Sequence, residues 1–317
     1  MIITNYQIMI IVEVVFPIFA IALLGYIVAY KGIFGIRDIE GISRYVFNIA
    51  IPVMLFEAMA GLDFPENIDF AFLLSYYLIA VTMFALGIGL SKIWFNYSAP
   101  EQSVFGMGTC YSNAVLIGLP LISTGLGEAA LLPTFMLIAV HSAIIFFLVT
   151  LFAERNDGIS QSPLAIGKQT LVSLVKNPII IGLVAGLLTN VLAIPVPRVI
   201  ASTVDIIGRS ALPSALFVVG ASLSVYKLAG QLRVAWTIVG LKMLVQPLLV
   251  WLLAFVVFQI DPLWGAVAVM MAAMPVGINV YMFAKKYQAC LAPVSSAIVI
   301  STTLAFFTQS ILLAIFI

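Results

Sequence analysis

Two stretches of this sequence combine proline, glycine and asparagine inside long apolar segments. The first reads Tyr111-Ser112-Asn113-Ala-Val-Leu-Ile-Gly118-Leu-Pro120, and the second reads Ala273-Met-Pro275-Val-Gly277-Ile-Asn279-Val-Tyr281. Proline removes a backbone donor and glycine loosens a helix, so each stretch predicts a helix break. Peptide groups that are freed in an apolar environment need partners, which water, an ion or a bound molecule can supply.

These two breaks predict an anion-binding site. Two half-helix N-termini that meet inside a membrane carry positive partial charge, which suits an anion. The side-chain amides of Asn113 and Asn279 can hydrogen-bond a carboxylate directly. Proline and glycine are also common in membrane helices as mere kinks, but the equivalent placement of the two stretches favours a site. The predicted substrate-binding residues of these stretches are Ser112, Asn113, Gly118, Pro120, Pro275, Gly277 and Asn279.

A lysine inside an apolar segment also needs a reason, because a charge at the centre of a membrane helix costs about 2.5–3.5 kcal/mol on insertion scales. Lys242 has no acidic residue near it in the sequence. It can neutralise an anionic substrate, pair with Glu57 or exchange a proton. It can equally snorkel to the interface, because only nine residues separate it from Arg233. Lys242 is therefore a candidate for both substrate binding and coupling.

Two further titratable groups are candidates for coupling to protons or sodium. Glu57 lies toward the outer end of the second apolar segment, and His141, the single histidine, lies in the middle of the fifth. A histidine can relay protons, although a hydrogen bond between helices is the blander interpretation. Arg44 and Arg209 lie near segment ends, where long basic side chains snorkel to the interface.

Enzymatic signatures are missing from the sequence. Metal sites need clustered histidine, cysteine or acidic ligands, whereas the chain has one histidine and two cysteines, both in apolar surroundings. The phosphate-binding loop G-x-x-x-x-G-K-S/T is absent, so direct use of ATP is not expected. Ser112 has no histidine base at a comparable depth. We therefore expect neither an enzyme nor a bound metal or cofactor.

The elements that must carry these residues are membrane helices. Of 317 residues, 63% are hydrophobic and only 9% are charged, against about 25% charged in an average soluble protein. So few charges cannot cover a soluble domain and form no basic face for nucleic acid. A spanning helix needs about 20 mostly apolar residues, and such segments predict an all-α integral membrane protein with ten spans. The predicted spans are 8–30, 40–60, 70–92, 102–125, 131–153, 172–193, 203–226, 233–258, 263–284 and 293–316.

Basic residues predict how the chain crosses the membrane, because Lys and Arg are retained on the cytoplasmic side. Even-numbered connections carry one basic residue, Arg198, and the acidic residues Asp63, Glu66, Asp69, Glu128 and Asp261. Odd-numbered connections carry ten basic residues: Lys31, Arg37, Lys92, Arg155, Lys168, Lys176, Lys227, Arg233, Lys285 and Lys286. This bias predicts both termini outside the cytoplasm, and we expect a multi-pass protein of a bacterial-type inner membrane.

An internal repeat relates the two halves of the chain. With a shift of 161 residues, 13 of the 50 positions from Glu13 to Leu62 are identical without a gap, where composition alone gives roughly four. Each half holds five spans, an odd number, so the second half enters from the opposite side. Such inverted repeats occur in many secondary transporters. The predicted organisation is a first repeat at 1–155, a cytoplasmic linker at 156–170 and a second, inverted repeat at 171–317.

The ordered set of motifs resembles the auxin efflux carrier family, which includes bacterial malate and malonate permeases and, more distantly, plant auxin exporters. The motifs are Pro17 with Gly25, Pro52-x-x-Leu-Phe, Ser112-Asn113…Gly118-Leu-Pro120, Lys242…Pro247 and Ala273-Met-Pro275. The resemblance covers essentially the full chain, but the long cytoplasmic loop of the plant exporters is absent.

The resemblance implies a fold similar to those of bile-acid symporters and sodium/proton antiporters, with helices four and nine broken where they cross. It implies an elevator-type carrier in which spans 1, 2, 6 and 7 form a scaffold, and the scaffold helices pair as a homodimer. It further implies that Asn113, Pro120, Pro275 and Asn279 bind or frame the substrate.

We therefore expect a secondary active transporter of small organic anions, mono- or dicarboxylates such as malate or malonate, with its site at the helix 4/9 crossing. One alternative is a cation/proton antiporter on a similar fold, which would need an acidic residue beside the crossing. The fourth and ninth predicted spans contain none. Another alternative is a membrane sensor that binds a ligand without transporting it.

Overall fold

The computed structural model describes residues 5–62, 69–155, 162–226 and 230–317. Within these ranges every regular element is helical, and the extended pairing is a single bridge between Ser112 and Val276. The all-α prediction is confirmed. Asp63, Glu66 and Lys227, which entered the charge count, lie outside the described residues, as does the 156–161 part of the predicted linker.

The α-helices follow one another along the chain with few long connections. They are α1 (Asn5–Tyr30), α2 (Ile36–Tyr45), α3 (Ile51–Ala60), α4 (Ala71–Phe95), α5 (Ala99–Gly108), α6 (Leu119–Leu126), α7 (Leu131–Ala153), α8 (Pro163–Val175), α9 (Pro178–Val191), α10 (Arg198–Arg209), α11 (Ala211–Leu223), α12 (Leu232–Gly240), α13 (Gln246–Trp251), α14 (Pro262–Ala272), α15 (Asn279–Tyr287) and α16 (Leu291–Phe316). Wider π-helical turns join several of them: η1 (Val46–Ala50), η2 (Ala114–Gly118), η4 (Leu241–Val245) and η5 (Leu252–Val257).

Among the described residues, seven helices are long and apolar enough to cross a membrane, and an eighth span results if the bent pair α8 and α9 counts as one. These eight coincide with predicted spans one to three, five to eight and ten. The fourth and ninth predicted spans are not among them, because each is interrupted and its pieces are short. Ala114–Leu126 and Pro262–Ala272 are the apolar pieces that remain.

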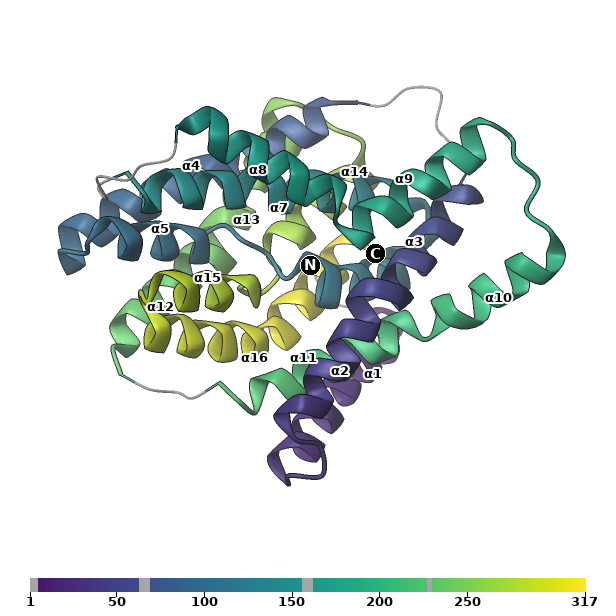
Figure 1. Cartoon of the computed structure of the whole chain (residues 1–317), viewed down its shortest axis with the longest axis horizontal. Helices are drawn as coiled ribbons and strands as arrows, with labels where there is room; N and C mark the ends of the chain where they lie inside the picture. Colours follow the sequence, from purple (N-terminus) through teal and green to yellow (C-terminus); the bar gives the residue numbers. More distant parts are fainter. Residues whose placement is uncertain (1–4, 63–68, 156–161, 227–229) are drawn as a thin grey trace.

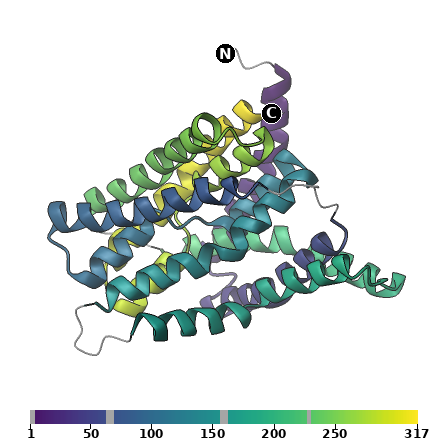
Figure 2. The same cartoon turned by 90° about the horizontal axis from the view of Figure 1, so that it is seen from above.

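The helices pack into two groups. We call α1–α3 with α9–α11 the scaffold group, in which α1 packs on α11 and α3 packs on α9. We call α4–α7 with α12–α16 the crossing group, in which α4 packs on α5, α5 on α7 and α12 on α16. The scaffold group occupies the right and lower parts of Figure 1 and the crossing group the left, and Figure 2 shows the same separation from above. Helix α8 lies along α7 at the boundary.

Glycines allow the two helix pairs of the scaffold group to approach closely. A Cβ on Gly220 of α11 would lie 1.6 Å from the backbone oxygen of Ala22 on α1. A Cβ on Gly182 of α9 would lie 2.2 Å from the backbone oxygen of Pro52 on α3. Small residues are how membrane helices bring their backbones together, because packing rather than hydrophobicity drives their association.

Helix α8 begins at Pro163, within the segment that was predicted as a cytoplasmic linker. The Ser162 side chain accepts a hydrogen bond from the Ala165 amide (3.2 Å), and proline occupies the first turn, which is a favourable helix start. Helix α9 starts in the same way at Pro178, where the Asn177 side chain accepts from the Ile179 amide (3.0 Å). The two helices meet at 63°, so Lys168 lies on α8 and not in a connection.

The glycine contacts predict a test of the scaffold packing. Replacing Gly220 with Ala should destabilise the protein by about 1–3 kcal/mol, because the new methyl group has no room against the α1 backbone. The thermal unfolding midpoint of the detergent-solubilised protein measures this loss. Gly89→Ala on α4 is the matched control, because a Cβ there meets nothing within 4 Å. Equal midpoints for the two variants would contradict the packing described here.

Candidate functional site

The two predicted breaks lie side by side and bond to each other. The Asn113 amide donates to the Pro275 carbonyl (2.9 Å), and the Gly277 amide donates to the Tyr111 carbonyl (2.9 Å). Helices α5 and α14 therefore end on one side of the pairing, and η2 with α6 and α15 begin on the other. Each break satisfies backbone groups that the other leaves free, which an apolar environment requires.

Glycine at position 277 is required by this close approach. A Cβ there would lie 2.5 Å from the ring of Tyr111 and 3.1 Å from the Ser112 backbone oxygen. The neighbouring Val276 amide, which faces the other way, donates to the hydroxyl of Ser301 on α16 (3.1 Å). The second break is thus held from both sides, by the first break and by α16.

Ser112 is held by three elements of the crossing group. Its hydroxyl donates to the Met271 carbonyl (2.7 Å) and lies 3.1 Å from the hydroxyl of Tyr76. Its backbone amide donates to Nε2 of His141 on α7 (3.2 Å). The expectation that no histidine lies at the depth of Ser112 is therefore wrong, because α7 passes directly beside the break. The serine hydroxyl already donates to a carbonyl, so the pair has no nucleophile–base geometry.

His141 lies where the blander interpretation placed it, as a hydrogen-bonded link between a helix and the break. Since Nε2 accepts from an amide, this nitrogen carries no proton and the ring is neutral, with its proton on Nδ1. The ring is 3% exposed, and it stacks on Tyr111 with centroids 4.7 Å apart. Its Nδ1 has no hydrogen-bond partner.

A chain of side chains fixes Asn279 at the start of α15. The Asn279 amide donates to the Tyr111 hydroxyl (2.8 Å), which lies 2.8 Å from the hydroxyl of Ser142 on α7. Since the tyrosine oxygen accepts from Asn279, it can donate onward to Ser142. Tyr111 and Ser142 were not predicted as site residues. Tyr111 opened the first motif, whereas no pattern in the sequence distinguished Ser142.

Lys242 and Gln246 donate to backbone carbonyls where the helices that precede the two breaks end. Lys242 is fully buried and donates to the carbonyl of Ala272, the last residue of α14. Gln246, one turn later, donates to the Cys110 carbonyl just beyond α5 (3.4 Å). Helix C-termini carry negative partial charge, so a lysine is well placed there. Lys242 does not pair with Glu57, which lies in the scaffold group on α3 beside Gly208.

A cavity of about 670 Å³ lies between the two groups at the crossing. The breaks and α7 line it on one side, and α2, η1 and the α8–α9 bend line it on the other. Of the predicted residues, it brings together Ser112, Asn113, His141, Gly277 and Asn279. Gly118, Pro120, Lys242, Pro275 and Glu57 do not line it. Sequence analysis missed two charged lining residues, Glu40 and Arg44 of α2, because α2 was treated as a span end.

Both half-helices that start at the breaks direct their N-terminal ends toward this cavity. Asn113 precedes the first turn of η2 and α6, and Asn279 opens α15. The first turn of a helix leaves amide groups without intrahelical acceptors. The Asn113 side-chain amide is also unpartnered, although the residue is only 5% exposed. A buried donor without an acceptor is costly, which makes it the clearest candidate for a ligand contact.

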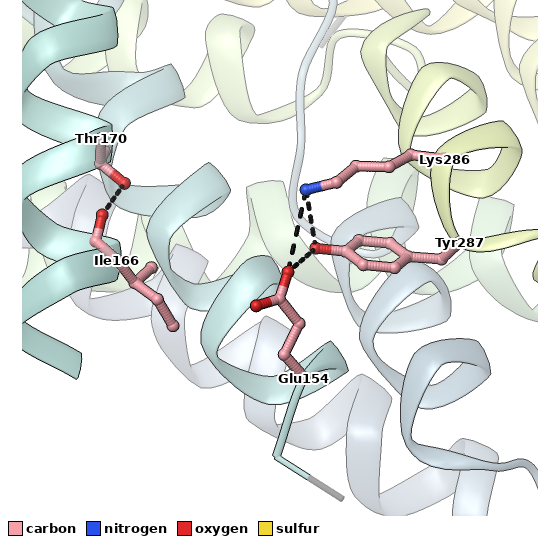
Figure 3. Close-up of polar contacts among 5 residues, drawn as sticks. All are labelled: Glu154, Ile166, Thr170, Lys286 and Tyr287. Carbon is pink, nitrogen blue, oxygen red and sulfur yellow. Dashed lines mark hydrogen bonds and ion pairs between the residues drawn. The ribbon is translucent and has the colours of Figure 1, made fainter. Parts of the chain in front are cut away.

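The crossing group is tied together at the end where α7 and α15 finish. Figure 3 shows the Tyr287 hydroxyl donating to the Glu154 carboxylate (3.2 Å), with the Lys286 ammonium 3.9 Å from the same oxygen. The figure also shows Thr170 of α8 donating to the Ile166 carbonyl of its own helix (2.9 Å). The hydroxyl of Thr170 is therefore used within α8.

Leaving aside the bonds of Gln169 on α8 and of Ser295, Ser296 and Ala314 on α16, no hydrogen bond or ion pair joins the scaffold group to the crossing group among the described residues. Tyr45 with Ser210 and Asn190 with Met59, for example, bond inside the scaffold group. The contacts between the groups are apolar, for example the edge-on pair of Phe19 on α1 and Phe306 on α16. Outside those four residues, the described part of the boundary that contains the cavity lacks the directional bonds that hold each group together.

The chain is similar to known membrane proteins. A family model described as "Membrane transport protein" matches residues 10–313. A protein of Rhizobium meliloti (strain 1021) named "Putative malonate transporter" is 24% identical over 303 residues, covering 94% of this chain and 93% of that protein. The "Lysosomal cholesterol signaling protein" of Mus musculus is 24% identical over 307 residues, covering 90% of this chain and 35% of that protein.

The buried lysine predicts a stability effect. Lys242→Met should lower the free energy of unfolding by about 1–3 kcal/mol, because it leaves the Ala272 carbonyl buried and unpaired. The thermal midpoint with and without bound anion separates this role from ligand binding. Lys92→Met, at the exposed end of α4, is the control. A reduced anion affinity with an unchanged midpoint would contradict the structural role.

Proposed function

The chain belongs to the membrane transport protein family that comprises the auxin efflux carriers, and on this premise we propose that it is a secondary active transporter of small organic anions. The observation that carries the proposal is the unpartnered Asn113 amide at the N-terminal end of a half-helix, in a cavity that a second half-helix N-terminus also borders. Neutral N–H donors at helix N-termini suit a carboxylate. The Rhizobium relative, by its name, supports malonate as a candidate substrate.

We propose ten spans arranged as two inverted repeats of five. The two interrupted segments supply the ninth and tenth spans beside the eight found by length and composition. The packing supports the repeat, because α1 of the first half pairs with α11 of the second, and α9 of the second half pairs with α3 of the first. Such pairing is what a pseudo-two-fold axis in the membrane plane produces.

The orientation we propose has the cavity open to the cytoplasm and both termini outside it, in a bacterial-type inner membrane. Basic residues of several odd-numbered connections meet at one end of the crossing group. Arg155 donates to Gln102, Arg233 lies over the ring of Phe95, and Lys286 lies near Glu154. The cavity is lined by Glu40 and Arg44, which follow the basic connection between α1 and α2.

We propose elevator-type motion of the crossing group against the scaffold group. The apolar boundary supports it, since directional bonds would have to break at each cycle, whereas apolar contacts can be exchanged for others. By the family resemblance the scaffold helices pair as a homodimer. The coupling ion belongs to the same proposal: protons or sodium, with Glu57, His141 and Lys242 as the candidate groups.

The first test is uptake of labelled malonate into proteoliposomes that contain the purified chain. We expect saturable uptake that unlabelled malate and malonate compete with. Imposed proton and sodium gradients identify the coupling ion by which one drives accumulation. Saturable binding without flux would contradict transport and favour a ligand sensor, an alternative consistent with the signalling name of the mouse relative.

The second test changes the charge of the proposed anion donor. Asn113→Asp replaces the amide donor with an acceptor of nearly the same shape, and it should abolish malonate uptake because two carboxylates then face each other. Asn113→Ala should reduce uptake at least tenfold, on the scale of one hydrogen bond to a charged group. Rates of uptake at equal protein density measure both effects.

The matched control for these variants is Thr303→Ala on α16, whose side chain is exposed and bonds within its own helix. Its uptake should equal that of the unmodified chain. Elution as a single species and an unchanged thermal midpoint separate loss of function from misfolding. Full uptake by a folded Asn113→Asp variant would rule out this residue as the anion donor, and cation transport by it would favour the antiporter alternative.

A further inference from the structure

Two charged side chains of the cavity, Arg44 and Glu40 of α2, are not used by the crossing. The exposed Arg44 lines the cavity together with Asn113, and it is the single lysine or arginine among the described residues that line it. Its guanidinium has no hydrogen-bond or ion-pair partner among the described residues. Glu40, one turn earlier on the same helix, also lines the cavity, yet the two do not form an ion pair. All five donors of the guanidinium are therefore available to a ligand.

The position of Arg44 is fixed by the scaffold group. The next residue, Tyr45, lies 2.7 Å through its hydroxyl from the hydroxyl of Ser210, between α10 and α11. Val46, which follows, is fully buried. The helix that carries Arg44 is therefore attached to the scaffold group, with α11 as its packing partner. In contrast, the neutral donors at Asn113 and Asn279 belong to the crossing group.

The geometry points to Arg44 as a second carboxylate subsite that makes the cavity select dicarboxylates over monocarboxylates. This inference rests on the proposed function. One carboxylate of the substrate binds the neutral donors at the crossing, and the other binds the guanidinium, whose planar fork matches a carboxylate. A second carboxylate placed only among neutral groups would remain without a counter-charge in a largely apolar cavity. The subsite thus assigns specificity to a residue outside the breaks.

Two pairs of probes isolate the second carboxylate. Malonate and malonamate differ only in that one carboxylate becomes an amide, and succinate and succinamate repeat the comparison with a longer spacer. The measurement is the concentration of each that halves labelled malonate uptake into proteoliposomes. For the unmodified chain we expect the diacid to inhibit about tenfold more strongly than its amide in at least one pair, as one hydrogen-bonded charge contact allows.

The variant Arg44→Gln should abolish this preference, by weakening inhibition by the diacid about tenfold while changing inhibition by the amide less than about threefold. Arg44→Lys should retain part of the preference, because it keeps the charge but not the fork. Arg37→Gln is the matched control, because Arg37 lies on the same helix and is exposed like Arg44 but does not line the cavity. Glu40→Gln should strengthen inhibition by the diacid, because it removes a negative charge near the subsite.

The outcomes separate this inference from the function on which it rests. If the unmodified chain takes up malonate and Arg44→Gln keeps the diacid preference, or loses affinity for diacid and amide alike, the subsite is wrong and the transport proposal stands. If the unmodified chain takes up no malonate and none of the probes binds, the proposed function and the subsite both fail. Retained preference in Arg37→Gln together with lost preference in Arg44→Gln supports the subsite.

Discussion

Backbone amides and carbonyls have no water to bond inside a membrane, and this constraint shapes the centre of the molecule. Two interrupted helices meet there, and each supplies the partner that the other lacks, through Asn113 with Pro275 and Gly277 with Tyr111. Neither break could persist alone without leaving several buried groups unpaired. The crossing is therefore a single structural unit, although its two interrupted segments are far apart in the sequence.

The same constraint explains the polar residues around the crossing. Lys242 and Gln246 bond carbonyls where α14 and α5 end, and His141 and Ser301 bond amides of the two breaks. Each of these side chains forms a hydrogen bond with a backbone group and thereby stabilises the crossing. The Asn113 side-chain amide, by contrast, lies where a helix begins, lines the cavity and has no partner. A ligand can supply the acceptor that this amide lacks.

The sequence predicts well what depends on local composition. Apolar runs located the seven long helices and the bent pair of the described residues, and proline with glycine located both breaks. It predicts poorly what depends on which helices become neighbours. No local pattern could predict that His141 lies beside Ser112, or that Lys242 bonds to Ala272 and not to Glu57. The start of α8 could have been predicted, because Ser162 followed by Pro163 is a typical helix-start signal. The search for apolar runs did not use this signal.

The place of Arg44 in the cavity also depends on neighbouring helices. Depth estimated along one helix placed it near a span end, where snorkelling is the ordinary expectation, whereas the cavity that reaches it exists only because α2 faces the breaks. A carrier gains from this separation of charge and motion. A buried cation that travelled with the substrate would be costly to move through the membrane. In the elevator motion that we propose, neutral donors on the moving group and a fixed cation on the scaffold avoid that cost.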